Sequence, residues 1–463
     1  MRPDPDRLLE ILPRYDQAGP RYTSYPTAPT WSDDFGPADA RAALARLAER
    51  GDEPLSLYAH VPFCSSLCHF CACNRVITKK QELPARYLEV LDRELEAVHD
   101  AIGATRALGQ IHLGGGTPTH LSPEQLHRLF GAIRGRFDQA EGAEVSIEVD
   151  PRVTGEGHMQ AMAELGVTRL SMGVQDFEPK VQEAIHRTQS VAQVEQLVDW
   201  ARGAGLDGVN FDLIYGLPFQ TEVSFDRTLD EVVRLLPDRI ALYSYAHVTW
   251  VAKQQRGFER GDLPSAERKL RIMLLAIGRL LDAGYEYIGM DHFVRPEDEL
   301  AVAAREGTLH RNFMGYTTRP ARDLVAIGPS GISELADAYL QSARDLNEWD
   351  ERVTKDGLAT FRGHELSEDD HERSWIIHSI MCRMGVSAPE YRERFGADFA
   401  ERHAHELALL EPLEADGLVE RLGDGGLRVT ADGQLLLRNV AMAFDAYLPE
   451  QRRSGGRLFS QTI

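Results

Sequence analysis

The sequence predicts an α/β fold in which parallel strands alternate with helices. Short apolar segments of strand length recur along the first half of the chain, and amphipathic helical patterns separate them. This alternation is typical of βα units joined by right-handed crossovers, in a sheet that is open or closed into a barrel. After about residue 360 the alternation stops and helices dominate. The predicted strands are residues 55–60, 110–113, 145–149, 169–174, 208–214 and 239–246.

Helix signals fall between these strands. Residues 83–98 carry Pro84 near the start and apolar residues on a single face, which is the pattern of an amphipathic helix. Residues 122–125, Ser-Pro-Glu-Gln, form a capping box with proline at the first helical position. Further predicted elements are helices over 193–203 and 224–236 and a small C-terminal hairpin over 417–430.

Bulk composition limits the classes of function. The chain has 463 residues, enough for two or three domains with a sizeable core. Its net charge of −21 argues against nucleic-acid binding, which needs Lys and Arg to neutralise phosphates. The N-terminus is charged, and no apolar run has the length of a membrane span. We therefore expect a cytoplasmic protein with no nucleic-acid or membrane partner.

Four of the five cysteines lie close together, directly after the first predicted strand. Cys64, Cys68 and Cys71 have the spacing C-x3-C-x2-C, and Cys73 follows. Three thiolates from one loop can hold a 4Fe–4S cluster and leave one iron open to a ligand that is not protein. A zinc site would need all four thiols from this one loop, and disulfides are uncommon in chains of this kind. Cys382 lies far away in an apolar stretch and is most simply a buried small side chain.

Unusual residues recur where the predicted strands end. Glycines follow the second strand at 114–116, Glu148 and Asp150 end the third, and Gln175 ends the fourth. Each has a simpler explanation alone, such as a tight turn, or a helix N-cap for Asp150. Because the carboxyl ends of parallel strands share one edge, the set together predicts a ligand site there.

The cysteine loop resembles the signature of the radical S-adenosylmethionine (radical SAM) enzymes. Together with Cys73, segments along nearly the whole chain are similar to the oxygen-independent coproporphyrinogen III oxidases of haem biosynthesis, a subgroup of that family. The resemblance implies an incomplete (βα)6 barrel over residues 51–350. It also implies an N-terminal arm over 1–50 that closes the site, and a mainly helical C-terminal domain over 360–463 with a winged-helix-like hairpin. The similar segments are 18–28, 114–119, 170–177, 211–218, 289–293, 310–318 and 438–444.

The resemblance also implies site residues. Cys64, Cys68 and Cys71 would ligate one 4Fe–4S cluster, and Cys73 would not. Two SAM molecules are expected side by side. The first would contact Tyr58, Gly115, Glu148 and Ile332. The second would contact Phe70, Gly116, Thr117, Gln175, Arg187, Asp212 and Ala246. The candidate catalytic residues are Tyr58, Glu148, Phe313 and Ile332.

The activity that the resemblance implies is oxidative decarboxylation of two propionates of coproporphyrinogen III to vinyl groups, by a 5′-deoxyadenosyl radical. The expected partners are the tetrapyrrole and a flavodoxin- or ferredoxin-type reductant, and the expected state is a monomer. A tetra-acid substrate needs cations despite the acidic chain. The candidates are Arg21, His292, Arg295, His310 and Arg311, and Arg21, Tyr22 and Tyr25 of the arm are expected to help close the site.

Two observations test the resemblance from within the sequence. Met314 stands where many family members have Gln, so a polar role at that position is in doubt. The alternative function is a radical SAM-like haem chaperone that binds haem without decarboxylation. Such chaperones carry His-Asn-x-x-Tyr-Trp in the region where this chain has residues 310–316, and they lack the fourth cysteine, so both features favour the oxidase.

Overall fold

Six parallel strands form the centre of the molecule and confirm the predicted alternation. The computed structural model describes residues 4–80, 82–206, 208–249, 252–453 and 459–462. All six predicted strands are present, and each pairs in parallel with the next along the chain. They are β1 (Leu55–Val61), β4 (Ala107–Gly115), β5 (Asp138–Val149), β6 (Arg169–Gln175), β7 (Gly208–Tyr215) and β8 (Arg239–Ser244).

Further strands extend this sheet on both sides. A seventh parallel strand, β13 (Leu324–Ile327), pairs with β1 and is fully buried. The order is β16-β15-β14-β13-β1-β4-β5-β6-β7-β8-β10-β9, so the sheet ends in two edges and the barrel is incomplete, as predicted. The antiparallel additions are β14 (Ile332–Leu335), β15 (Ala338–Ser342), β16 (Thr360–Glu365), β9 (Glu286–Gly289) and β10 (His292–Val294).

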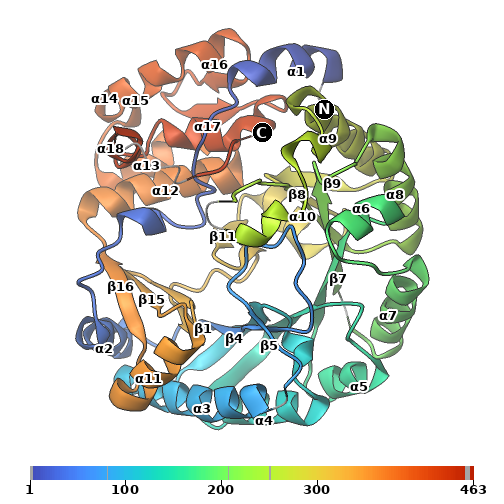
Figure 1. Cartoon of the computed structure of the whole chain (residues 1–463). Helices are drawn as coiled ribbons and strands as arrows, with labels where there is room; N and C mark the ends of the chain where they lie inside the picture. The colour runs from blue at the N-terminus through green and yellow to red at the C-terminus, as the bar shows by residue number, and fades with distance from the viewer. Residues whose placement is uncertain (1–3, 81, 207, 250–251, 454–458, 463) are drawn as a thin grey trace.

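Helices cover the outer face of the curved sheet (Figure 1). In α4 (Pro123–Arg134), Ser122 accepts from the amide of Gln125 and the Gln125 side chain accepts from the amide of Ser122, so the predicted capping box is present. The apolar face of α3 packs inward and its polar face stays in solvent. The other outer helices are α3 (Glu82–Ile102), α5 (Glu156–Glu164), α7 (Val191–Gly203), α8 (Glu222–Leu235) and α9 (Ala266–Asp282).

The C-terminal part packs helices around a small sheet. Its longest helix is α12 (Glu368–Arg383), and the predicted hairpin is present as β18 (Val419–Arg421) and β19 (Leu427–Val429). Strand β16 belongs to the large sheet, so that sheet extends to Glu365. No helix in the described ranges is long and apolar enough to cross a bilayer.

The N-terminal arm joins the two parts. A short 3-10 helix (Leu12–Arg14) follows α1 (Pro5–Ile11). The chain then makes backbone hydrogen bonds with the last described residues: the amide of Gly19 donates to Ser460, and that of Thr462 donates to Gln17. The buried Arg438 of α17 (Leu437–Met442) donates to the carbonyls of Gly19 and Pro20. The arm is therefore fastened to the C-terminal part along the edge of the barrel where the parallel strands end.

Candidate active site

Polar side chains on alternate residues of the parallel strands surround a small cavity inside the barrel. The cavity holds about 140 Å³, and its wall includes His112, Ser146, Glu148, Asp212 and Tyr243. Alternate residues of a strand face the same side of a sheet, so this period of two explains why these side chains meet. The same period of two in the sequence also indicates His112 and Ser146. These two residues were not among the predicted site residues.

Glu148 is held by two donors from the neighbouring strand β4. The amide of Gly115 lies 3.2 Å from its Oε2, and Nε2 of His112 lies 3.5 Å from its Oε1. Burial alone would raise the pKa of Glu148, but His112 and the amide of Gly115 hold it below its ordinary value. Because 42% of the side chain stays exposed, an ionised carboxylate is presented to a ligand. An ionised carboxylate is a strong acceptor for hydroxyl or ammonium groups.

Asp212 lies on the same side of the sheet as Glu148 and has a different protonation state. It accepts from the side chain of Asn210 at 2.9 Å and from Ser171 Oγ at 3.2 Å. Burial and the nearby charge of Glu148 raise its pKa to about 7. Two carboxylates in one cavity separate their pKa values when one is better solvated by donors. The site therefore presents one charged and one titratable carboxylate.

The glycines at the end of β4 let its backbone approach the residues that follow β1 closely. A Cβ on Gly116 would lie 2.6 Å from the carbonyl oxygen of Pro62, and Gly115 has a φ of +114°. A side chain at Gly116 would therefore clash with the backbone, and an L residue at Gly115 would be strained at this positive φ. Thr117 follows, with Oγ1 3.5 Å from Cys64 Sγ. Gly115, Gly116 and Thr117 thus join the edge of β4 to the cysteine loop.

The cysteine loop presents its thiols at this same edge. Cys68 is buried, while Cys64 and Cys71 are partly exposed and Cys73 is exposed. A hydrogen bond with Cys73 lowers the pKa of Cys71 below its usual range, although burial opposes this. Within the described ranges, no three Cys, His, Asp or Glu side chains converge on one point, as a zinc ion would require. Thiolates that bind a cluster instead bond different irons and stand around it.

Two arginines reach Cys68 and were not recognised as a pair from the sequence. Arg152 Nη2 lies 3.4 Å from Cys68 Sγ and Arg187 Nη1 lies 3.6 Å from it, and both pair with Asp150. Arg187 and Arg152 outweigh the burial of Asp150 and hold its pKa at about 2. The expectation that Asp150 caps a helix is wrong, because the N-cap of α5 is Gly155. Asp150 instead orients cations toward the cysteine loop.

The buried cations beside Cys68 fit an anionic group. Arg187 Nε is buried with no hydrogen-bond partner in the part of the chain that the structure describes. An iron–sulfur cluster with thiolate ligands carries negative charge, and SAM carries a carboxylate, so two guanidinium groups are suitable neighbours for either. The residues present therefore fit a 4Fe–4S cluster on Cys64, Cys68 and Cys71.

The other predicted contacts lie around the loop and the strand ends. Gln175 ends β6 with a φ of +67°. Phe70 packs on a small apolar cluster that contains Ile185 and Tyr245. The carbonyls of Phe70 and Ala246 both accept from the side-chain amide of Gln255, so this amide joins the loop to the end of β8.

The predicted catalytic residues occupy two regions. Tyr58 lies on β1, where its Oη is 3.0 Å from His60 Nδ1 and its ring stacks on His112. Phe313 lies in the turn between β11 (His310–Asn312) and β12 (Gly315–Thr317), with its ring against Trp31 and Tyr339. Ile332 begins β14, separated from β1 in the sheet by β13. Trp31 of the arm therefore contacts one of the predicted catalytic residues.

The predicted substrate cations separate into two groups. Arg295 pairs with Glu297, the ring of His310 contacts that of His378 at an angle of 45°, and the buried Arg311 donates to carbonyls of the arm. These contacts give the three side chains a structural role. His292 lines the barrel cavity, and Arg21 lines a larger cavity beside it while it pairs with Asp291.

Comparisons with known proteins agree with this geometry. The profile of the Radical SAM superfamily matches residues 58–232, and that of the HemN C-terminal domain matches residues 366–436. Membership of this superfamily implies that the chain binds a 4Fe–4S cluster and SAM.

Curated relatives extend the similarity to nearly the whole chain. The oxygen-independent coproporphyrinogen III oxidase of Salmonella typhimurium is 45% identical and covers 98% of this chain and 98% of its own. That of Synechocystis sp. is 43% identical, over 98% and 97%. The solved coproporphyrinogen III oxidase (HemN) from Escherichia coli, a radical SAM enzyme, is 44% identical, with a TM-score of 0.89 over 92% of this chain and 97% of that one. Similarity of this extent shows that the chain belongs to the oxygen-independent coproporphyrinogen III oxidase family of radical SAM enzymes.

Proposed function

We propose that this chain converts coproporphyrinogen III to protoporphyrinogen IX without oxygen, by oxidative decarboxylation of two propionates. The observation that carries the proposal is the meeting of Cys64, Cys68 and Cys71 with Glu148 and the Gly115–Thr117 backbone at one edge of the barrel. Family membership over nearly the whole chain supplies the substrate class. Each vinyl group forms when its propionate loses one hydrogen atom, one carbon dioxide and one electron.

Different site residues would bind the cluster and SAM. Cys64, Cys68 and Cys71 would hold the cluster. Glu148, with its depressed pKa, would accept from hydroxyl or ammonium groups of SAM. Arg187 has a planar fork beside Cys68 and would bind a carboxylate. The same reasoning assigns SAM contacts to Tyr58, Gly115, Gly116, Thr117, Gln175, Asp212, Ala246, Phe70 and Ile332.

The number of SAM molecules is part of the proposal. When bound, the reduced cluster and SAM supply the 5′-deoxyadenosyl radical that removes the hydrogen atom from the β-carbon of a propionate. Asp212 lies on β7 and Glu148 on β5, and Ala246 and Phe70 lie farther toward the end of β8. A row of contacts spread over these strands supports two SAM molecules side by side.

The protein would also have to exclude water from the radical. Residues 1–50 include an arm whose Trp31 contacts Phe313 and whose Arg21 pairs with Asp291 beside His292. These contacts support a role for the arm in closing the site. We also infer a monomer in the cytoplasm, with a flavodoxin- or ferredoxin-type reductant, as the family resemblance implies.

An anaerobic turnover assay tests the proposal. Reconstituted protein would receive SAM, a strong reductant, an electron acceptor and coproporphyrinogen III. We expect protoporphyrinogen IX and 5′-deoxyadenosine, both absent with Cys68→Ala, while Cys382→Ala stays active because Cys382 lies in the C-terminal core. A protein that carries an intact cluster and binds haem but makes no decarboxylated product would be a chaperone instead.

A further inference from the structure

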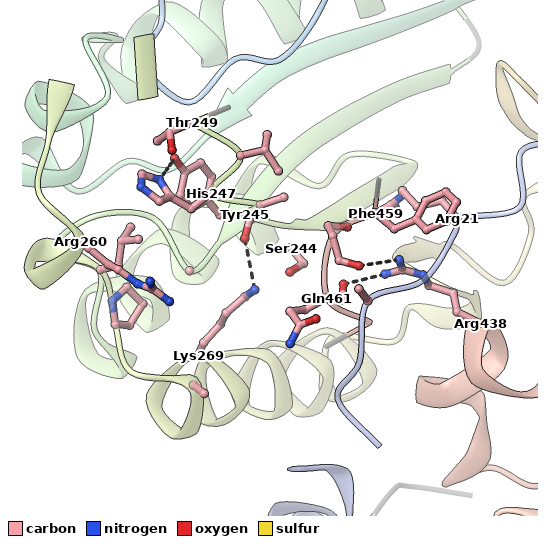
Figure 2. A pocket seen from close by; sticks show the side chains of 18 of the residues that line it. Arg21, Ser244, Tyr245, His247, Thr249, Arg260, Lys269, Arg438, Phe459 and Gln461 are labelled. Atoms are coloured by element: carbon pink, nitrogen blue, oxygen red, sulfur yellow. Dashed lines mark hydrogen bonds between the residues drawn. The ribbon is translucent and has the colours of Figure 1, made fainter. Parts of the chain in front are cut away.

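A large cavity lies beside the end of β8. It holds about 960 Å³, within the range of small-molecule sites. The segment 244–249 forms one wall, the start of α9 forms the second, and the arm and the last described residues form the third. Figure 2 shows these three walls around an open centre. The cavity is thus built from parts of the chain that are far apart in the sequence.

The wall of this cavity has one sign of charge. Five cationic side chains line it, and none of the described lining residues is Asp or Glu, in a chain whose net charge is −21. Such a local excess focuses a positive potential inside the cavity. The lining cations are Arg21, Arg260, Lys269, Arg438 and Arg452.

Three of these cations have contacts that hold the walls together. Arg21 pairs with Asp291, Arg438 donates to carbonyls of the arm, and Arg452 donates to Gln17 and Ala18. Most of their hydrogen-bond donors already contact protein acceptors, although their charge still contributes to the positive potential in the cavity. Lys269 and Arg260 are the candidates for direct contact with a ligand because their side chains line the open part of the cavity (Figure 2).

Lys269 reaches into the cavity from α9, with Arg260 on one side of it and Arg438 on the other (Figure 2). Its ammonium group donates to the carbonyl of Tyr245 at 3.2 Å. The pKa of Lys269 is lowered to about 8, mainly by burial; the charge of Asp16 opposes this shift and that of Arg438 adds to it. An anionic ligand would offset this cost of burying a charge.

The cavity adjoins the proposed cofactor site. Ala246, a proposed SAM contact, lines it, and Tyr245 and Ser244 lead from it along β8 toward the barrel. A molecule bound here would place one end beside the reacting centre and its other end among the cations. A tetrapyrrole with four propionates has this distribution of charge.

Resting on the proposed function, we propose that this cavity binds the propionates that are not being decarboxylated, with Lys269 and Arg260 as direct contacts. These contacts would position the ring so that one propionate at a time faces the radical. Between the two reactions the tetrapyrrole has to turn while it stays bound. Weaker binding of the retained carboxylates by Lys269 and Arg260 should therefore release more of the three-propionate intermediate.

Binding and turnover together test this inference. Coproporphyrin III, a stable fluorescent tetra-acid, would be titrated into the holoenzyme, with its tetramethyl ester as the uncharged comparison. We expect Lys269→Gln with Arg260→Gln to weaken coproporphyrin III binding and to raise the KM of coproporphyrinogen III by about tenfold or more, since each lost contact is charge-assisted. The kcat should change less than about threefold, and the share of three-propionate product should rise. The ester should bind weakly to all variants.

Controls separate this role from a structural one. Arg268→Gln changes an exposed residue of the same helix, which pairs with Glu222, and should leave every value unchanged. Lys269→Arg should restore most of the affinity, and SAM affinity should be the same in all variants. Unchanged KM and coproporphyrin affinity in the double variant, with normal turnover, would overturn the cavity proposal and leave the proposed function intact. Charge-dependent porphyrin binding without any turnover by the unaltered enzyme would do the reverse.

Discussion

Two glutamates on one strand show how the two ends of the barrel differ. Glu144 and Glu148 lie on the same face of β5, one toward each end. Glu144 is 11% exposed and pairs with Arg169 at 2.8 Å and with Gln110 at 2.8 Å. Glu148 is 42% exposed and lies among donors that leave part of its carboxylate open. Sequence alone makes the two positions look alike.

The amino end of the barrel is closed by paired charges. Arg169 and Arg239 both contact Asp298 and Glu299 at the start of α10 (Glu299–Glu306). At the carboxyl end, the partly exposed carboxylate of Glu148 and the thiols of the cysteine loop are presented to ligands. The difference teaches that the state of pairing, more than burial or residue type, separates a structural charge from a functional one. The predictions below test this difference, from the largest effect to the smallest.

The cysteine loop should show the largest effect. Cys71→Ala should lose cluster absorption and all turnover, because a ligand is removed. Cys73→Ala, in the residue whose amide lies 3.4 Å from Cys71 Sγ, should keep iron, sulfide and most of its activity. Iron and sulfide analysis after reconstitution measures both. Loss of the cluster in both variants would mean that Cys73 is also a ligand.

Glu148→Gln should lower kcat/KM for SAM by about 10²-fold or more, since a charged acceptor is lost from an enclosed site. The neutral amide has the same shape, so the urea midpoint of unfolding should move little. Comparison with Glu144→Gln sharpens the test, because that variant should keep its activity per folded molecule. An active Glu148→Gln enzyme would break the distinction between the two ends.

Arg169→Gln should give the opposite result at the amino end. The change leaves Glu144 with Gln110 as its remaining side-chain partner and removes one contact of Glu299. Breaking a buried ion pair from one side costs about 3 kcal/mol. Chemical denaturation should show this loss of stability, while turnover per folded molecule stays close to that of the unaltered enzyme. A large loss of turnover in fully folded protein would contradict the structural role.

Asp212 should make the stability of the cofactor-free protein depend on pH. Burial and the charge of Glu148 raise its pKa to about 7, so the folded protein keeps a proton that the unfolded chain releases at its lower, ordinary pKa. This contribution is fully present at acidic pH and is lost as the pH rises through about 7. Relative to the unaltered protein, Asp212→Asn should therefore gain about 2 kcal/mol between pH 5 and pH 8. Equal shifts in both proteins would refute the assignment.

Met314→Gln should have the smallest effect. Met314 lines the barrel cavity, and its amide donates to Asn312. A glutamine fits a similar volume, so turnover should change less than about threefold. A larger gain would mean that a polar group at this position contacts a ligand and that the methionine weakens this enzyme.

Much of the fold could be predicted from the sequence because the parallel strands are apolar segments that alternate with capped, amphipathic helices. Strand β13 was missed because Leu324–Ile327 is only four residues long and gains its place by pairing with β1, far back along the chain. The predicted division into arm, barrel and C-terminal domain stays a prediction, although the large sheet continues through β16.

Prediction of the site was best where residues share one strand edge. The glycines of β4 and the carboxylates of β5 were expected at one edge from topology, and Asp212 of β7 was expected from the family resemblance. Arg152 was missed because Asp150 resembled a helix cap, and the cavity around Lys269 was missed because its walls come from distant segments. Arg311 was expected to face the substrate, whereas in the structure it donates to carbonyls of the arm. Such partners depend on tertiary contacts that local patterns do not contain.

The backbone hydrogen bonds between residues 17–19 and 460–462 set the order in which the enzyme can be completed. During translation the cysteine loop and the barrel leave the ribosome long before residues 460–462 are made. Earlier parts of a chain begin to fold first, whereas this wall of the large cavity waits for the tail. The large cavity is therefore completed only after the strands of the barrel have been made.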